Sequence, residues 1–109
     1  MRKQKVFSFG KVDYYGTGRK INEVEVEVNI RDWNGYDELS ICAGVWNMHH
    51  TDYVTCGQCL DDIKDNTCKG HNKLFLELHR LWKLYHLTKL SDIPADDLQK
   101  VYKLMEVEA

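Results

Sequence analysis

The clearest pattern of hydrophobic and polar positions lies in residues 21–31, where valine or isoleucine alternates with polar side chains. Strict alternation with a period of two predicts a β-strand with one buried face and one solvated face. The apolar positions share one predicted face and the acidic positions share the other: Val24, Val26, Val28 and Ile30 against Glu23, Glu25 and Glu27.

Neighbouring segments extend this strand into an antiparallel meander. Residues 4–15 are rich in aromatic and β-branched side chains and predict a first strand. Asn34-Gly35 predicts a two-residue hairpin turn that leads into a further strand over residues 37–46. The predicted core positions of that strand are Leu39, Ile41, Ala43 and Val45. Residues 47–55 form a loop or a short fourth strand, so we expect three to four strands in all.

The C-terminal part of the chain changes to a helical period. Residues 72–88 place apolar side chains three and four positions apart, which predicts an amphipathic helix. Its predicted buried face comprises Leu74, Leu78, Leu81 and Tyr85, widened by Phe75, Trp82 and Leu84. Residues 91–94 end this helix, and Asp96 and Asp97 suit the first turn of another. The predicted buried face of the last helix is Leu98, Val101, Tyr102 and Met105.

The whole chain predicts one α+β domain. Its 109 residues suit a single domain, with a sheet part over residues 1–55 and a zinc knuckle with two to three helices over residues 56–109. No apolar run long enough for a signal peptide or a membrane span is present, so we expect a cytoplasmic protein. The formal net charge of −2 gives no general reason to expect nucleic-acid binding.

Four residues have the spacing of a zinc site, C-x2-C-x8-C-x2-H. They are Cys56, Cys59, Cys68 and His71. Two residues between ligands allow a tight turn to direct both side chains at one tetrahedral ion. Thiolates are soft donors, so this set favours zinc over magnesium or calcium. Four protein ligands leave no open coordination position, which predicts a structural Zn²⁺ rather than a catalytic one.

Several alternatives to this ligand set remain open. The fourth ligand is His71 in our prediction, and its rivals are Cys42, His49, His50 and His79.

Glycines inside the two pairs, Gly57 and Gly70, permit the sharp backbone of a knuckle. Binding of zinc to such peptides contributes roughly 10–16 kcal/mol. That is comparable to the roughly 5–15 kcal/mol stability of a typical domain, so a site of this strength can decide whether this half of the chain folds.

Two further interpretations of the cysteines are weighed against zinc. The cysteines could be buried small hydrophobic residues without a metal. The pair in CGQC, followed by a short helix over LDDIKD, also resembles a thioredoxin-like redox motif. A redox fold of that kind requires a buried strand before the pair within a βαβ unit, whereas the preceding stretch HHTDYVT is polar.

Other polar clusters give weaker indications of function. Glu23, Glu25 and Glu27 form an acidic row that is either a solvated strand face or a patch that meets a basic groove on a partner. The long helix carries basic side chains that could contact phosphate if the sheet offered further basic residues, but the sheet carries mainly glutamates. These side chains are His79, Arg80, Lys83 and His86. No nucleophile motif accompanies the histidines at 49 and 50, so we expect no enzyme activity.

Three stretches carry a resemblance to known proteins: KVDYYGTGRK, GVWNMHHTDYVTCGQCLDDI and HRLWKLYHLTKL. They resemble small proteins of phages and mobile elements in Gram-positive bacteria, some of which lack the first cysteine of CGQC. The chain is also similar in size and cysteine content to the zinc-containing type II-A anti-CRISPR proteins. That resemblance implies a cytoplasmic location in a bacterial host cell and a role as an inhibitor that binds the RNA-guided effector nuclease.

The sequence therefore supports a ranked set of functional hypotheses. The first is a zinc-stabilised, non-enzymatic phage inhibitor that acts by protein–protein interaction, binding a type II CRISPR effector nuclease and blocking its action on DNA. A strongly basic nucleic-acid channel in such a nuclease suits a local acidic patch. The second is a zinc-knuckle nucleic-acid-binding phage regulator, and the weakest is a CxxC redox protein.

Overall fold

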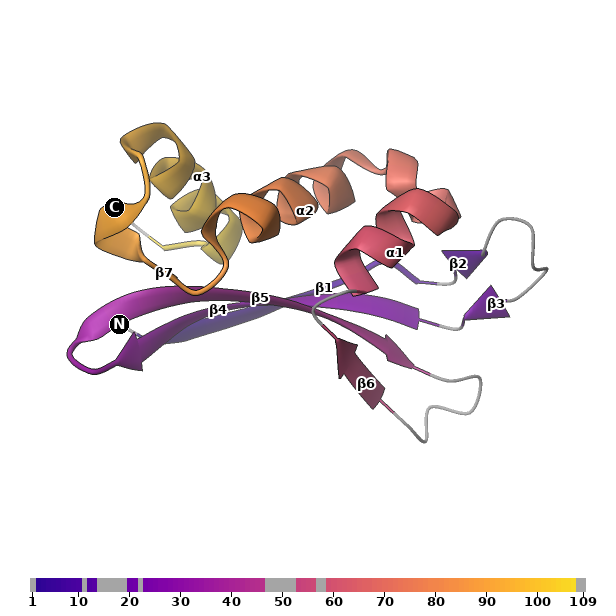
Figure 1. The fold of residues 1–109 in the computed structure, drawn as a ribbon, viewed down its shortest axis with the longest axis horizontal. Coiled ribbons are helices and arrows are strands. Elements are labelled where there is room, and N and C mark those ends of the chain that lie inside the picture. Colours follow the sequence, from indigo (N-terminus) through magenta and orange to yellow (C-terminus); the bar gives the residue numbers. More distant parts are fainter. Residues whose placement is uncertain are drawn as a thin grey trace.

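The fold has two layers, a twisted antiparallel sheet and a set of helices that all lie on one side of it (Figure 1). This computed structural model describes residues 2–10, 12–13, 20–21, 23–46, 53–56 and 59–107. The class is α+β, as the sequence predicted, because strands precede helices along the chain and the two kinds of element are segregated.

The main sheet has the strand order β1-β4-β5-β6, with a short β7 also paired to β5. All of its pairings are antiparallel, which confirms the predicted meander. Its strands are β1 (Lys3–Ser8), β4 (Glu23–Trp33), β5 (Tyr36–Trp46), β6 (Tyr53–Cys56) and β7 (Thr88–Lys89). A separate two-stranded ladder joins β2 (Val12–Asp13) to β3 (Lys20–Ile21).

The long hairpin of β4 and β5 forms the centre of the sheet. Asn34 and Gly35 take φ values of 51° and 82° at its turn, and positive φ at both central residues is the requirement of the hairpin turn that Asn-Gly predicts. The predicted core positions with described side chains are at most 2% exposed: Val24, Val26, Val28, Ile30, Leu39, Ile41 and Ala43. The side chain of Val45 lies outside the described residues.

The first strand is shorter than the sequence predicted. β1 ends at Ser8, and Gly10 takes a φ of 68°. Phe9 N donates to Val24 O at 2.9 Å, while Val24 N donates to Gly10 O at 3.2 Å. Two residues therefore oppose one on β4, as in a β-bulge, which ends the regular pairing. The predicted single strand over 4–15 is thus wrong in its extent, and residues 14–19 lie outside the described part.

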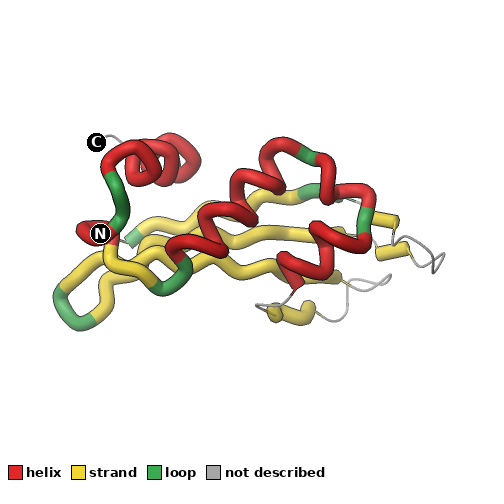
Figure 2. The backbone as a smooth tube through the Cα atoms, turned by 45° about the horizontal axis from the view of Figure 1, so that its top comes forward, coloured by secondary structure: helices red, strands yellow, loops and turns green. Residues whose placement is uncertain are grey.

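The helices pack on the face of the sheet that carries the valines (Figure 2). They are α1 (Cys59–Asn66), the 3₁₀ turn η1 (Cys68–His71), α2 (Lys73–Tyr85), the 3₁₀ turn η2 (Leu90–Asp92) and α3 (Ala95–Met105). The predicted breaks and the last helix are confirmed. α2 ends at Tyr85 rather than at 88, because Leu87 takes a φ of 62° and the chain turns into β7.

The predicted buried stripe of α2 is only partly correct. Phe75, Leu78 and Leu81 are buried, whereas Leu74 and Leu84 are 39% and 55% exposed. The helix is therefore rotated so that Phe75 faces the sheet, where it meets Phe9 edge to face at 5.5 Å. Leu60 and Ile63 of α1 and Val101 and Met105 of α3 complete one continuous hydrophobic core.

Candidate functional site

The four predicted zinc ligands lie at the ends of consecutive short elements. Cys56 is the last residue of β6 and Cys59 is the first residue of α1. Cys68 begins η1 and His71 ends it. Residues 57–58 and the side chains of Cys56 and Cys59 lie outside the described part of the structure, so the ligand set as a whole stays a prediction.

A tight backbone contact folds η1 back against α1. A Cβ at Gly70 would lie 2.0 Å from the carbonyl oxygen of Lys64, so the contact requires glycine at this position. Thr67 Oγ1 donates to Ile63 O at 2.6 Å and accepts from Lys69 N at 3.2 Å. The segment that carries Cys68 and His71 is therefore held by specific hydrogen bonds, and Gly70 acts through close approach rather than through positive φ.

Helix α1 separates the first pair of predicted ligands, Cys56 and Cys59, from the second pair, Cys68 and His71. An eight-residue helix with a rise of about 1.5 Å per residue separates its ends by about 10 Å. Sulfur atoms bound to one zinc lie within about 4 Å of each other, since each Zn–S bond is about 2.3 Å. Within the described residues, no group of three or more metal-ligating side chains is assembled. Binding of all four predicted ligands to one ion therefore depends on the turn of η1 back along α1, which the Gly70 contact begins.

The donors themselves suit zinc. Three thiols and an imidazole are a set that zinc binds in closed sites. Cys68 is half-buried and packs against the edge of the core, while His71 is exposed. A metal bound by both residues would fix His71, at the exposed end of η1, to Cys68 at the edge of the hydrophobic core.

The two rival ligands within the described residues, Cys42 and His79, are not positioned to complete the site. Cys42 is paired with Glu27 across β5 and β4, on the sheet face away from the helices. The sheet therefore separates Cys42 from η1, and it is not positioned to complete a site with Cys68. His79 Nε2 lies 2.8 Å from Asp61 Oδ1 and is engaged there. The histidines at 49 and 50 lie outside the described residues.

The contact of His79 with Asp61 joins α2 to α1. His79 is 12% exposed, and Lys83 Nζ lies 3.5 Å from the other oxygen of the same carboxylate. The hydrogen bond with His79 lowers the pKa of Asp61, and the charge of Lys83 adds to the effect. These basic side chains of α2 are therefore committed to a carboxylate within the protein rather than arranged to bind phosphate.

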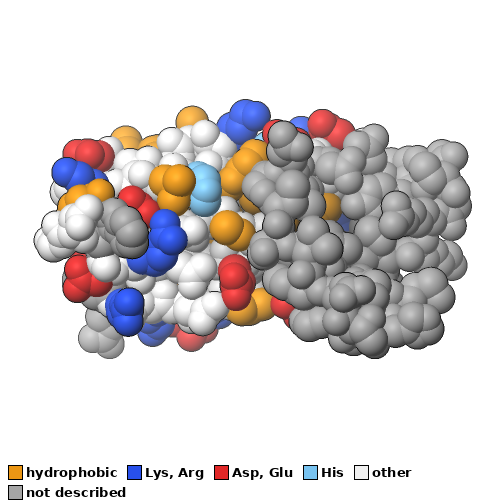
Figure 3. Space-filling view, turned by 60° about the horizontal axis from the view of Figure 1, so that its bottom comes forward, with side chains coloured by type: hydrophobic (Ala, Val, Ile, Leu, Met, Phe, Trp, Pro, Cys, Tyr) orange, Lys and Arg blue, Asp and Glu red, His pale blue; other side chains and the backbone are white. Residues whose placement is uncertain are grey.

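The acidic row lies on the sheet face that no described helix covers. Glu25 and Glu27 are half-buried there, and Gln4 Nε2 donates to Glu27 Oε1 at 2.8 Å. The side chain of Glu23 lies outside the described part. Arg31 pairs with Glu38 at 2.7 Å further along the hairpin. Figure 3 shows acidic, basic and hydrophobic side chains interspersed over the described part of this face, so its charge is local rather than uniform.

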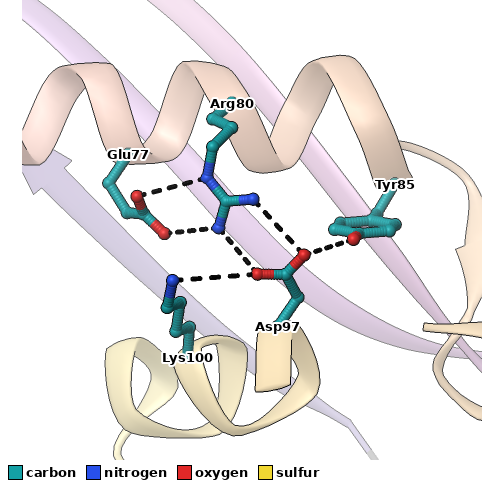
Figure 4. Close-up of polar contacts among 5 residues, drawn as sticks. All are labelled: Glu77, Arg80, Tyr85, Asp97 and Lys100. Atoms are coloured by element: carbon teal, nitrogen blue, oxygen red, sulfur yellow. Dashed lines mark hydrogen bonds and ion pairs between the residues drawn. The ribbon is translucent and has the colours of Figure 1, made fainter. Parts of the chain in front are cut away.

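A polar network that the sequence analysis missed joins α2 to α3 (Figure 4). Arg80 Nη2 lies 2.8 Å from both Glu77 Oε1 and Asp97 Oδ1. The hydroxyl of Tyr85 donates to Asp97 Oδ2, and Lys100 Nζ lies 3.9 Å away from Oδ1. The hydrogen bonds from Arg80 and then Tyr85 lower the pKa of Asp97 to about 2. The network fixes the docking of α3 on α2.

His86 accepts a hydrogen bond from the backbone of β5 at a position that neither β6 nor β7 covers. β7 pairs with β5 at Glu38 and Leu39, and β6 pairs with it only from Ala43 onward. Between them, Ile41 N donates to His86 Nδ1 at 3.1 Å. Burial lowers the pKa of His86, which favours the neutral ring that can accept this bond. The residue that the sequence placed on a polar helix face is therefore part of the sheet edge.

Comparisons with known proteins give no relative. No protein-family model matches the chain, and no curated protein matches its sequence. No solved structure matches its fold. Among the described residues, no helix is long and apolar enough to cross a bilayer.

Proposed function

We propose that this chain is a small, zinc-stabilised, non-enzymatic binding protein that inhibits a type II RNA-guided effector nuclease by contact through the open face of its sheet. The observation that carries this proposal is the position of Glu25 and Glu27, which lie side by side on β4 on the face opposite the helices. The partner is the one that the sequence resemblance implies.

The electrostatics of this face support docking rather than duplex mimicry. A type II nuclease holds its nucleic acid in a positively charged channel. A pair of half-exposed carboxylates can orient a docking protein against such a surface and speed the encounter. Charges of both signs occur on the same face, which suits a contact of limited area. Binding should weaken as salt is raised, because exposed charges are screened beyond about 8 Å at physiological ionic strength.

The engagement of the polar side chains supports a non-enzymatic role. His79, His86 and Arg80 each bond to another element of the fold, at Asp61, Ile41 and Asp97 respectively. Groups held in this way position helices and close the sheet edge. We accordingly assign them to stability, and we assign recognition to the sheet face.

Zinc would act by tying the segment before α2 to the end of the sheet. The ligands we propose are Cys56, Cys59, Cys68 and His71. The described contacts of this segment already include the Gly70 approach, the Thr67 hydrogen bonds and the packing of Cys68 against the core. With the ion bound, the β6 end and η1 would move as one unit.

The experiment is a binding and cleavage assay with a purified type II nuclease loaded with guide RNA. The chain should form a stable complex and reduce DNA cleavage, and Glu25→Lys should weaken the complex about tenfold. Asp92→Lys is the matched control, because it makes the same charge change at an exposed position in η2, among the helices. Equal affinity of the two variants would remove the acidic row from the mechanism. Absence of any complex would contradict the proposed function itself.

A further inference from the structure

Among the described residues, the backbone groups on the outer edge of β1 have no hydrogen-bond partner. Among the described strands, β1 pairs with β4 alone. The bond from Phe9 N to Val24 O sets the phase of that ladder. Since inward and outward groups alternate in an antiparallel pair, the N–H and C=O groups of Gln4, Val6 and Ser8 point away from β4. The edge is therefore able to accept another strand.

A hollow of about 420 Å³ lies directly over this edge strand. One wall is formed by Lys5 and Phe7 of β1. The other walls are formed by Glu77 of α2 and by the α3 side chains Lys100, Lys103 and Leu104. Phe7 and Leu104 make its surface apolar, and Lys5 Nζ lies 5.4 Å from the centre of the Phe7 ring. An apolar anchor would fit between them.

The charge around the hollow is mainly positive. Glu77 is paired with Arg80, and Lys5 pairs with Glu106 at 2.7 Å. Lys100 is 56% exposed and Lys103 is exposed. A second hollow of the same volume at the start of β1 is lined by Arg2, Lys3 and Arg31, with Asp32. A ligand along this edge would therefore meet more basic than acidic side chains, with the exposed Glu106 carboxylate beside Lys5.

We propose that the β1 edge binds an acidic, extended peptide segment of a partner protein as an added antiparallel strand. Backbone hydrogen bonds to Gln4, Val6 and Ser8 would supply affinity, as in strand addition to other sheet edges. Opposite Phe7, an apolar side chain would enter the hollow. Opposite Lys3 and Lys5, carboxylates of the added strand would meet the lysines, and at Lys5 the carboxylate would take the place of the exposed Glu106. This surface is distinct from the acidic row and does not depend on the proposed function.

Charge selects this occupant over a second copy of the chain. Two β1 edges paired with each other would bring Arg2, Lys3 and Lys5 of one chain close to the same residues of the other. Like charges across a strand pair are destabilising, and lysines at sheet edges oppose self-association. An acidic strand meets the same lysines favourably.

The test uses two synthetic peptides and four protein variants. The peptide TLVETE is designed to place leucine opposite Phe7 and glutamates opposite Lys5 and Lys3, and TLVKTK is its charge-reversed control. Binding is followed by the amide signals of the intact protein in NMR titrations. We expect TLVETE to shift Gln4, Val6 and Ser8, and we expect TLVKTK to bind at least about tenfold more weakly.

The variants separate backbone pairing from charge. Val6→Pro removes an outward N–H while leaving the β4 ladder intact, as proline is tolerated on edge strands, and Val6→Thr is its control. Lys103→Glu reverses a charge at the hollow, and Lys73→Glu makes the same change at an exposed site at the start of α2. We expect Val6→Pro and Lys103→Glu to weaken TLVETE binding at least about tenfold and about threefold, respectively, and neither control to do so.

Several results would overturn the proposal. Equal binding of the two peptides would remove the charge argument, and shifts confined to another surface would place the peptide elsewhere. Undiminished binding by a folded Val6→Pro protein would remove the strand pairing. Concentration-dependent dimerisation abolished by Val6→Pro would identify a second copy as the occupant. If Val6→Pro does not fold, Lys103→Glu and TLVKTK decide the outcome.

Discussion

Substitution of Gly70 by alanine tests the contact that folds η1 onto α1. The added Cβ would lie 2.0 Å from the Lys64 carbonyl oxygen, whereas ordinary contact begins at 3.4 Å. The opposing atom belongs to the backbone, so no side-chain rotation can relieve the clash. Overpacking of this kind costs about 1–3 kcal/mol. Alanine also restricts the unfolded chain, which offsets about 0.4–1 kcal/mol of that cost.

The expected net loss is about 1–2 kcal/mol of unfolding free energy. For a urea dependence of about 1–1.5 kcal/mol per molar, the unfolding midpoint should fall by about 0.7–2 M. Far-UV circular dichroism during urea unfolding, in chelator-treated protein, measures the change. Chelation is needed because bound zinc would stabilise the native state by mass action.

The matched control is Lys69→Ala, in the same 3₁₀ turn. Its backbone hydrogen bonds to Thr67 and Asn72 do not involve the lysine side chain. We expect a change within about 0.5 kcal/mol, as for most surface substitutions. A Gly70→Ala protein with the wild-type midpoint would show that η1 does not approach α1, and the reasoning about this segment would be wrong.

Three further predictions concern the polar contacts and the metal. The network lowers the pKa of Asp97 to about 2, so the stability that it contributes is present above the unfolded-state pKa of Asp97 and is lost as pH falls toward 2. Asp97→Asn should therefore make the urea midpoint depend less on pH across that range, and an unchanged pH dependence would contradict this. Burial lowers the pKa of His86, so the wild type should lose stability as pH falls through about 6.5, with faster Ile41 amide exchange, and His86→Ala should lose this pH dependence. Zinc added to metal-free protein should raise its thermal unfolding midpoint, because an ion that binds the native state stabilises it, and Cys68→Ser protein should respond less.

The sheet could be predicted because its pattern is local. β4 alternates strictly, and a one-residue change in register would reverse every side chain between core and solvent. Asn34-Gly35 fixed the turn because few dipeptides accept positive φ at both positions. The bulge at Gly10 could not be predicted, since glycine within an aromatic stretch is compatible with both a continuous strand and a bend.

The helical layer was less accessible to sequence reasoning. Apolar residues three and four positions apart made the helical period of α2 clear. Leucines lie on several sides of this helix, however, and the sequence did not show which of them would face the sheet. Leu74 and Leu84 remain exposed because Phe75 takes the buried position. Among the described side chains of α1, Leu60 and Ile63 are the buried apolar ones, and two such positions give a weak period.

The polar contacts between elements were missed for a related reason. Arg80 and Asp97 are 17 residues apart on separate helices, and their pairing depends on how those helices pack. His86 follows a helical stretch and gave no sign that it would cap a strand edge. A basic residue opposite an acidic residue on adjacent helices was the one available signal, and many such pairs exist in any chain of this composition.

The most direct test of the account is the metal content of the protein purified without chelator. Elemental analysis and native mass spectrometry should find about one zinc per chain. Separate replacement of Cys56, Cys59 and Cys68 by serine, and of His71 by alanine, should lower zinc occupancy and thermal stability, while Cys42→Ser should leave both unchanged. A metal-free protein that melts at the same temperature with and without added zinc would contradict the central claim.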